Sequence, residues 1–401
     1  MAKRKIQKPT RFERMYKVWD YLRKNTDRRH PTSIAKMRKD ENINAYIGDK
    51  ETINRLLKDM ANIMNLEDGG SDYKPEAEWR LYFDDFKKFY GDKERYERDD
   101  SDEDDSYIAN VMRIKNLYYN RTFSEKEVDS IIEGIMATRT LDSKSAQELV
   151  RKVEDNMTTA FYKRTSRHIC KVQEPELADR ELLKDNLAII QKAIDDNVRI
   201  QFRFNGYSYE KKLEPVRAEM DELSPYYIVA SGGKYYLLAA KEYEGYKPNM
   251  SIWRLDLMTD IEIPGRNDRL HIKGIPRISK KNVSNLPEKW SEDFQLKHLN
   301  MSFDKPVFVT LRIKSEKCED NPKKRVRPGY TFLHDWFGDS FTYIRTETKP
   351  PYDDIVRVEC SPYGMAHWAL QYSELVEVLE PESLREDIKS KIKALNEKYS
   401  L

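Results

Sequence analysis

Side chains that commonly carry catalysis are scattered along this 401-residue sequence. No histidine has a second metal-ligating residue at i+3 or i+4, the spacing that zinc hydrolases use. The six histidines are His30, His168, His271, His298, His334 and His367. The patterns GxxxxGK[ST], GxGxxG and GxSxG, which bind nucleotides or present a nucleophile, do not occur. The sequence therefore predicts that the protein is not an enzyme and binds neither a metal ion nor a cofactor.

The densest group of carboxylates is the run ERDDSDEDDS at 97–106, within an acidic insert at about 84–106. Carboxylates could hold the metal ions of a nuclease. This run lacks the apolar neighbours that would fix ligand geometry, and blocks of like charge are usually solvated. A second hypothesis is electrostatic, because an acidic loop beside a basic DNA-binding face would compete with phosphate and weaken non-specific binding.

The N-terminal residues form a basic head that precedes this insert. Residues 1–64 contain 17 Lys or Arg against 8 Asp or Glu, whereas residues 67–105 contain 7 against 16. Asp49 is a good N-cap for a helix with an apolar stripe. The opposite side of that helix presents residues suited to base edges and phosphates: Lys50, Thr52, Asn54, Arg55 and Lys58. An ordinary solvated polar face is the alternative.

Two shorter helical segments precede this helix, which is the arrangement of a helix-turn-helix. Alternating residues near 79–83 and 114–119 could supply the two strands of a wing. The sequence therefore predicts a winged helix-turn-helix DNA-binding domain at 1–120, interrupted by the acidic insert. A capping box at Ser124 and Glu127 opens a helical linker predicted at 121–197.

From Val198 the apolar residues alternate, and about five short strands with turns between them follow. Five short, bent strands suggest a small, partly closed β-barrel at 198–265. The stretch GGKYYLLAA at 232–240 is one of its strands, and both of its faces are apolar enough to be covered. A polar connector at 266–304 leads to a C-terminal α+β domain at 305–401.

Three segments of the barrel region resemble the WYL domain of bacterial transcription regulators, a small SH3-like or Sm-like barrel named for a Trp-Tyr-Leu triplet. Tyr235, Tyr236 and Leu237 stand at the triplet, KKLEP corresponds to a basic strand, and WRLDLMTDIEI to the closing strand. The resemblance extends to the winged helix that precedes such domains and to their C-terminal extension. Tyr235 replaces the family's Trp, and Leu257 stands where a second Arg is usual.

The resemblance implies that the barrel binds an effector, in several relatives a nucleic acid, through basic and aromatic residues on one face. Carried over by position, these residues are Tyr236, Lys211 and Arg254; the alternation of the first strand adds Arg203. From the residues alone, core packing is the favoured explanation of the two tyrosines, because aromatic side chains on short strands usually fill a barrel. Arg254 lies among apolar neighbours and requires a partner or an edge position.

The expected fold class is therefore a multidomain α+β protein with an N-terminal winged helix, a helical linker, a small SH3/Sm-like β-barrel and a C-terminal α+β domain. The first functional hypothesis is a cytoplasmic, ligand-responsive transcription regulator that binds double-stranded DNA as a homodimer, its barrel sensing a nucleic acid or nucleotide. The alternative is a nucleic-acid-binding accessory protein of a phage-defence or CRISPR system. No apolar run is long enough to cross a membrane, and the three cysteines are expected to be reduced thiols.

Overall fold

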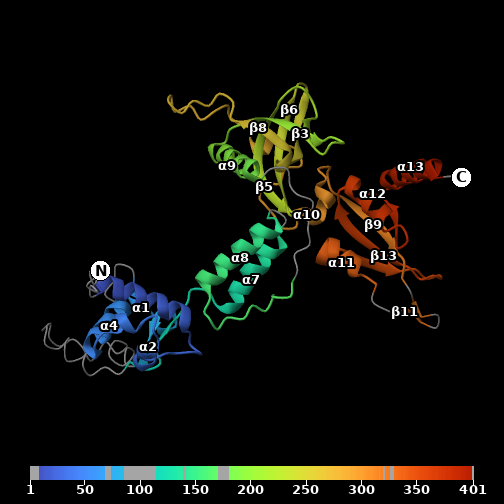
Figure 1. The fold of residues 1–401 in the computed structure, drawn as a ribbon. Helices are drawn as coiled ribbons and strands as arrows, with labels where there is room; N and C mark the ends of the chain where they lie inside the picture. Colours follow the sequence, from blue (N-terminus) through green and yellow to red (C-terminus); the bar gives the residue numbers. More distant parts are fainter. Residues whose placement is uncertain are drawn as a thin grey trace. The chain divides into compact units, whose positions relative to one another are not determined.

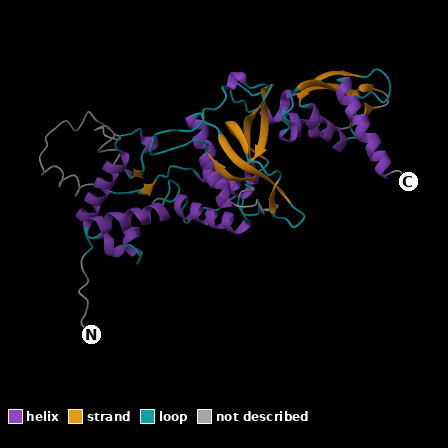
Figure 2. Ribbon diagram, turned by 90° about the horizontal axis from the view of Figure 1, so that it is seen from above, coloured by secondary structure: helices purple, strands orange, loops and turns teal. Residues whose placement is uncertain are grey.

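The computed structural model describes residues 9–67, 74–84, 114–138, 141–169, 180–315, 317–318, 321–325 and 329–399. The chain divides into two compact units, Met1–Glu174 and Pro175–Leu401, drawn in Figure 1 from blue to green and from green to red. Apart from Asp84, the predicted acidic insert lies outside the described residues. Figure 2 shows that helix predominates in the N-terminal unit and that the larger sheets belong to the second unit.

The described part of the N-terminal unit begins with four helices, α1 (Arg11–Asn25), α2 (Ile34–Lys39), α3 (Asn44–Ile47) and α4 (Lys50–Asn65). Three of them, α1, α2 and α4, start at a residue whose side chain accepts a backbone N–H of the first turn. Thr10 and Glu13 form a capping box on α1, and the Asp49 carboxylate accepts the Thr52 N–H at 2.7 Å at the start of α4. Helix α3 was not expected; it forms where Ile43 and Ile47, four residues apart, are both buried.

A two-stranded antiparallel ribbon follows α4, as the sequence predicted. Strand β1 (Leu81–Tyr82) pairs with β2 (Tyr118–Tyr119), and Leu81 lies opposite Tyr119. The short helix η1 (Glu76–Glu78) precedes β1. The core under these elements includes Val18, Leu22, Met37, Leu57, Phe83 and Leu117.

The side chain of Asn65 attaches the ribbon to α4. It is fully buried; its amide donates to the Leu81 carbonyl at 2.8 Å, and its oxygen accepts the N–H groups of Arg80 and Leu81 at 2.8 and 3.1 Å. Each of these groups would otherwise be buried or half-buried without a partner.

Asn65→Ala is therefore expected to destabilise the N-terminal unit by about 2–3 kcal/mol, because two backbone donors lose their acceptor. Amide hydrogen exchange of β1 and α4 measures this change. The matched control is Asn44→Ala, since Asn44 is exposed; equal effects of the two substitutions would contradict the attachment role.

Helices α7 (Glu125–Ala137) and α8 (Ser143–Met157) complete the N-terminal unit. The predicted capping box of Ser124 and Glu127 is present at the start of α7. The backbone after α8 returns to α1, where the Ala160 N–H donates to the Lys24 carbonyl at 2.8 Å. The Arg121 guanidinium donates to the Thr158 carbonyl at 2.7 Å, so these helices belong with the DNA-binding candidate helices and not with the barrel.

The second unit begins with α9 (Arg180–Asp196) and a curled sheet. The strands are β3 (Ile200–Tyr207), β4 (Leu213–Pro215), β5 (Asp221–Ser231), β6 (Lys234–Tyr243), β7 (Tyr246–Arg254) and β8 (Met258–Glu262), with η3 (Leu255–Leu257) between the last two. The order is β4-β3-β5-β6-β7, and β8 pairs with β3, so the sheet curls back on itself. Leu183 and Ile190 of α9 lie in the core of this sheet. The predicted linker at 121–197 is thus divided between the two units.

Both faces of β6 are covered, as its alternation predicted. Leu237 and Ala239 lie in the core shared with α9, whereas Leu238 and Ala240 lie in a second core. That second core is closed by residues of the connector, Val283, Leu286, Phe294 and Met301. The connector contains η4 (Lys280–Asn282), α10 (Phe294–Lys297) and η5 (Leu299–Met301), so it is a structural part of the barrel.

The C-terminal domain is an antiparallel sheet with helices. The strands are β9 (Val307–Ile313), β10 (Lys317–Cys318), β11 (Asn321–Arg325), β12 (Thr342–Thr346), β13 (Asp354–Cys360) and β14 (Val376–Glu380). The helices are α11 (Thr331–Phe337), η6 (Gly338–Ser340), α12 (Pro362–Gln371) and α13 (Glu382–Tyr399). The main sheet has the order β12-β13-β9-β14.

The stretch TFLHDW at 331–336 predicts a strand from its sequence, and this prediction is wrong, because Thr331–Phe337 forms helix α11. Leu333 and Phe337 are both fully buried, and their spacing of four residues suits a helix face and not the alternation of a strand. His334 lies on the exposed side of α11, near Asp339.

Cys360 is a free, buried thiol, and burial raises its pKa to about 12.

Candidate functional site

The N-terminus of α4 carries part of the predicted DNA-binding set. Lys50 and Arg55 are exposed and Thr52 is half-buried. Arg55 forms an exposed ion pair with Glu51 at 2.8 Å, one that phosphate can replace at small cost. These three residues are available on the first turn and a half of the helix.

Asn54 and Lys58, the other two predicted residues, have buried side chains. They share a helix face with Asn65, which binds β1. Ile63, by contrast, is spaced along the sequence with the apolar stripe of this helix, which predicts that it is buried, and it is 68% exposed. The buried arc of α4 is therefore rotated toward the ribbon, which narrows the polar face that the sequence suggested.

Two arginines that the sequence reasoning missed converge on the turn before α4. Arg38 of α2 donates to the Gly48 carbonyl at 3.1 Å. Gly48 has φ +69°, which favours glycine at this turn, and Nη1 of Arg14 lies 2.5 Å from the place that a Cβ of residue 48 would take. The hydrogen bond from Thr52 lowers the pKa of Asp49, and the charge of Arg14 adds to that effect. Arg14, Arg38 and Lys50 thus gather near one helix N-terminus, which itself attracts anions.

In the barrel, the structure brings together two of the predicted effector residues. Tyr236 on β6 lies directly opposite Arg254 on β7. Arg254 finds the partner that its apolar surroundings required: its Nε and Nη2 donate to the Asp256 carboxylate at 3.1 and 2.6 Å. Hydrogen bonding to Asp256 raises the pKa of Arg254, with smaller contributions from Tyr236 and Tyr207. Tyr207 is 48% exposed and was not predicted, although it ends the strand that contains Arg203.

The other two predicted effector residues lie elsewhere on the sheet. Arg203 is paired with Asp260 at 3.4 Å and donates to the Ala218 carbonyl at 3.0 Å. Lys211 is exposed in the turn between β3 and β4, with φ +63°. The candidate effector surface is therefore built around Tyr207, Tyr236 and Arg254.

A buried carboxylate in the same sheet was also missed. Asp221 is fully buried and lies 2.7 Å from the Lys241 amine and 3.2 Å from Arg217. The Arg217 guanidinium also lies over the Trp253 ring, 6.0 Å from its centre. Lys241 comes directly after the apolar residues 235–240 of β6. A charged residue next to such a run is a sequence signal that it needs a partner.

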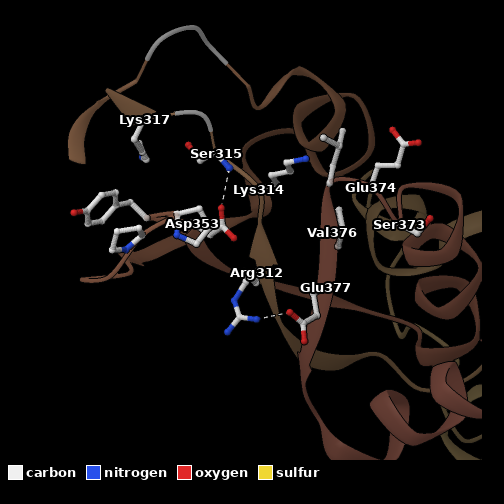
Figure 3. A pocket seen from close by; sticks show the side chains of 13 residues that line it. Arg312, Lys314, Ser315, Lys317, Asp353, Ser373, Glu374, Val376 and Glu377 are labelled. Atoms are coloured by element: carbon white, nitrogen blue, oxygen red, sulfur yellow. Dashed lines mark hydrogen bonds and ion pairs between the residues drawn. The ribbon is translucent and has the colours of Figure 1, made fainter. Parts of the chain in front are cut away.

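The C-terminal domain contains a recess of about 860 Å³. Figure 3 shows Arg312 facing Glu377 across neighbouring strands and Asp353 turned toward the Ser315 backbone. Arg312 also bonds Glu347 at 3.1 Å, so its charge is compensated within the domain. Charged and polar side chains therefore line most of this recess, together with Pro350, Pro351, Leu375 and Val376.

Two kinds of feature, a metal-ligand cluster and a membrane-spanning helix, are not found in the described ranges. Three or more His, Cys, Asp or Glu side chains do not converge there as ligands of a metal ion would. None of the helices in the described part of the chain is both long and apolar enough to span a bilayer.

Comparison with known proteins identifies the C-terminal domain. Residues 305–395 match the WCX domain, a part of WYL-type regulators. This match confirms the predicted C-terminal extension; the resemblance of residues 198–265 to the WYL barrel and of residues 1–120 to a winged helix stays a prediction. The comparison with curated proteins found no match.

Two solved structures align with the chain at low similarity. Proteasome accessory factor B/C (PafBC) of Arthrobacter aurescens is 16% identical over 72% of this chain and 40% of that chain, with a TM-score of 0.21. The chain thus spans about two fifths of the length of that protein. A CRISPR Cas-related protein is 12% identical over 87% of both chains, with a TM-score of 0.28. These scores are too low to support an argument from structural likeness.

Proposed function

We propose that this protein is a DNA-binding regulator of the WYL type whose curled sheet senses an effector. The match of residues 305–395 to the WCX domain carries this proposal, because that domain is part of such regulators. The basic N-terminus of α4, with Arg14, Arg38 and Lys50, is its proposed DNA contact. Tyr207, Tyr236 and Arg254 form its proposed effector surface, where aromatic and guanidinium groups suit a base and a phosphate.

Arg38→Ala combined with Arg55→Ala is expected to weaken binding to duplex DNA at least about tenfold at low salt, since two phosphate contacts are lost. The slope of log affinity against log salt should fall by about 2. Fluorescence anisotropy with a duplex from the region upstream of the gene, at several salt concentrations, measures both quantities.

The matched control is Lys126→Ala combined with Lys152→Ala, which removes the same charge from exposed positions on α7 and α8. A control that weakens binding as much as the arginine pair would show that net charge alone is responsible. Unchanged binding by the arginine variant would refute the proposed contact.

The accessory-protein alternative shares the basic head and differs in its preferred nucleic acid. A regulator should prefer a duplex, ideally with two related half-sites. An accessory clamp should prefer a single strand of the same sequence. Affinities for the two forms at matched salt therefore separate the two functions.

A further inference from the structure

A recess with a basic lining lies within the N-terminal unit, bounded by α7, α8 and the segment after α8. Its volume of about 460 Å³ falls within the range of small-molecule sites. Ser143, Gln147 and Arg151 follow one another on a single face of α8 at intervals of four residues. Arg164 and Arg167, from the segment after α8, complete the polar side.

The segment that supplies these two arginines is fixed to α7. Asp129 of α7 is buried and accepts hydrogen bonds from the Tyr162 hydroxyl at 2.6 Å and the Thr165 hydroxyl at 2.7 Å. Arg164 and Arg167 flank Thr165 closely in sequence. Their backbone positions are therefore determined by the fold and not by a ligand, as a preformed site requires.

The charges that line the recess are not balanced. Three arginines, Arg151, Arg164 and Arg167, line the recess with one carboxylate, Glu154; the Asp129 carboxylate, which interacts with Arg164, does not line it. The ion pair between Nη1 of Arg164 and Glu154 spans 3.6 Å, too long for a hydrogen bond. Nε of Arg164 is buried and has no hydrogen-bond acceptor among the residues that the structure describes. A buried guanidinium donor without an acceptor is unfavourable.

We propose that this recess binds a small phosphorylated molecule. Guanidinium groups bind phosphate oxygens through paired N–H donors, and Ser143 and Gln147 add neutral donors beside them. Met136, Val150 and Ile169 give the recess an apolar side, which would contact the organic part of the ligand. A backbone phosphate of duplex DNA has no separate organic group that could fill the apolar side of the recess. We therefore assign the site to a small molecule that is not part of a nucleic acid.

Equilibrium dialysis of the full chain with labelled inorganic phosphate tests this site. About one phosphate should bind per chain, and Arg151→Gln combined with Arg167→Gln should weaken binding at least about tenfold, because two of the three guanidinium groups are lost. Both arginines are exposed, so this variant should fold. Arg164→Lys keeps the charge and loses the paired donors, and should weaken binding severalfold.

The control is Lys126→Gln combined with Lys152→Gln, which changes the net charge equally outside the recess and should leave phosphate binding unchanged. Absence of binding, or equal losses in the arginine and lysine variants, would overturn the proposal. In a protein that also carries Arg38→Ala and Arg55→Ala, an excess of short duplex DNA should not displace the labelled phosphate; displacement would assign the recess arginines to the DNA backbone and also overturn the proposal. The result is independent of whether the protein regulates transcription.

Discussion

Asp354→Ala is expected to destabilise the C-terminal domain by about 3–5 kcal/mol, because it leaves a buried lysine without its counter-ion. The Asp354 side chain is fully buried, and Lys317, 3% exposed, lies 3.0 Å away. The Tyr330 hydroxyl donates to the same carboxylate at 2.8 Å. The Thr346 hydroxyl of β12 donates to it as well, so four elements, β10, β12, β13 and the start of α11, depend on one charge.

Hydrogen exchange of the β9 and β13 amides measures this effect within the domain. Exchange should accelerate by about two to four powers of ten. Asp339→Ala is the control, since the Asp339 side chain is fully exposed, and such surface changes usually stay within about 0.5 kcal/mol. A small effect of Asp354→Ala would mean that the network contributes little to stability.

Arg254→Ala is expected to destabilise the curled sheet by about 3 kcal/mol, and this loss of stability does not depend on whether an effector is bound. The reason is that the Asp256 side chain, 2% exposed, would be left charged and unpaired. The double substitution Arg254→Ala with Asp256→Asn should recover more than half of the loss. Hydrogen exchange of β6 and β7 measures both variants.

Arg203→Ala is the matched control, because Arg203 lies on the same sheet in an exposed pair with Asp260, worth about 0–1 kcal/mol. Equal costs for the two arginines would contradict a structural role for Arg254. A test of effector binding should then use Arg254→Lys and Tyr207→Ala, which leave Asp256 with a cationic partner.

Local signals in the sequence predicted the elements with caps or strict alternation. Asp49 begins α4, Ser124 begins α7, and Leu237 and Leu238 on β6 enter separate cores. In each case neighbouring residues alone determine the outcome, through a side-chain acceptor for free N–H groups or through the two-residue repeat of a strand.

Positions decided by distant contacts were not predictable in this way. Asn54 and Lys58 are polar, so the sequence suggests that they face solvent. They are buried because they lie on the same side of α4 as Asn65, which binds the ribbon. The pairing of Arg254 with Asp256 depends on the turn into η3, which brings residues two apart together. The seven residues of α11 mix apolar and polar side chains in a way that fits either a helix or a strand, so the sequence alone does not predict the helix.

The connector has a consequence for how the second unit can be divided. Phe294 and Met301 close a core of the curled sheet, whereas Leu299 lies in the core of the C-terminal domain. Lys297 between them pairs with Glu359 of β13 at 3.0 Å. A chain that is cut within 278–301 would expose both hydrophobic cores at once. The curled sheet and the C-terminal domain should therefore unfold cooperatively and be expressed as one piece. A truncated protein should begin before α9.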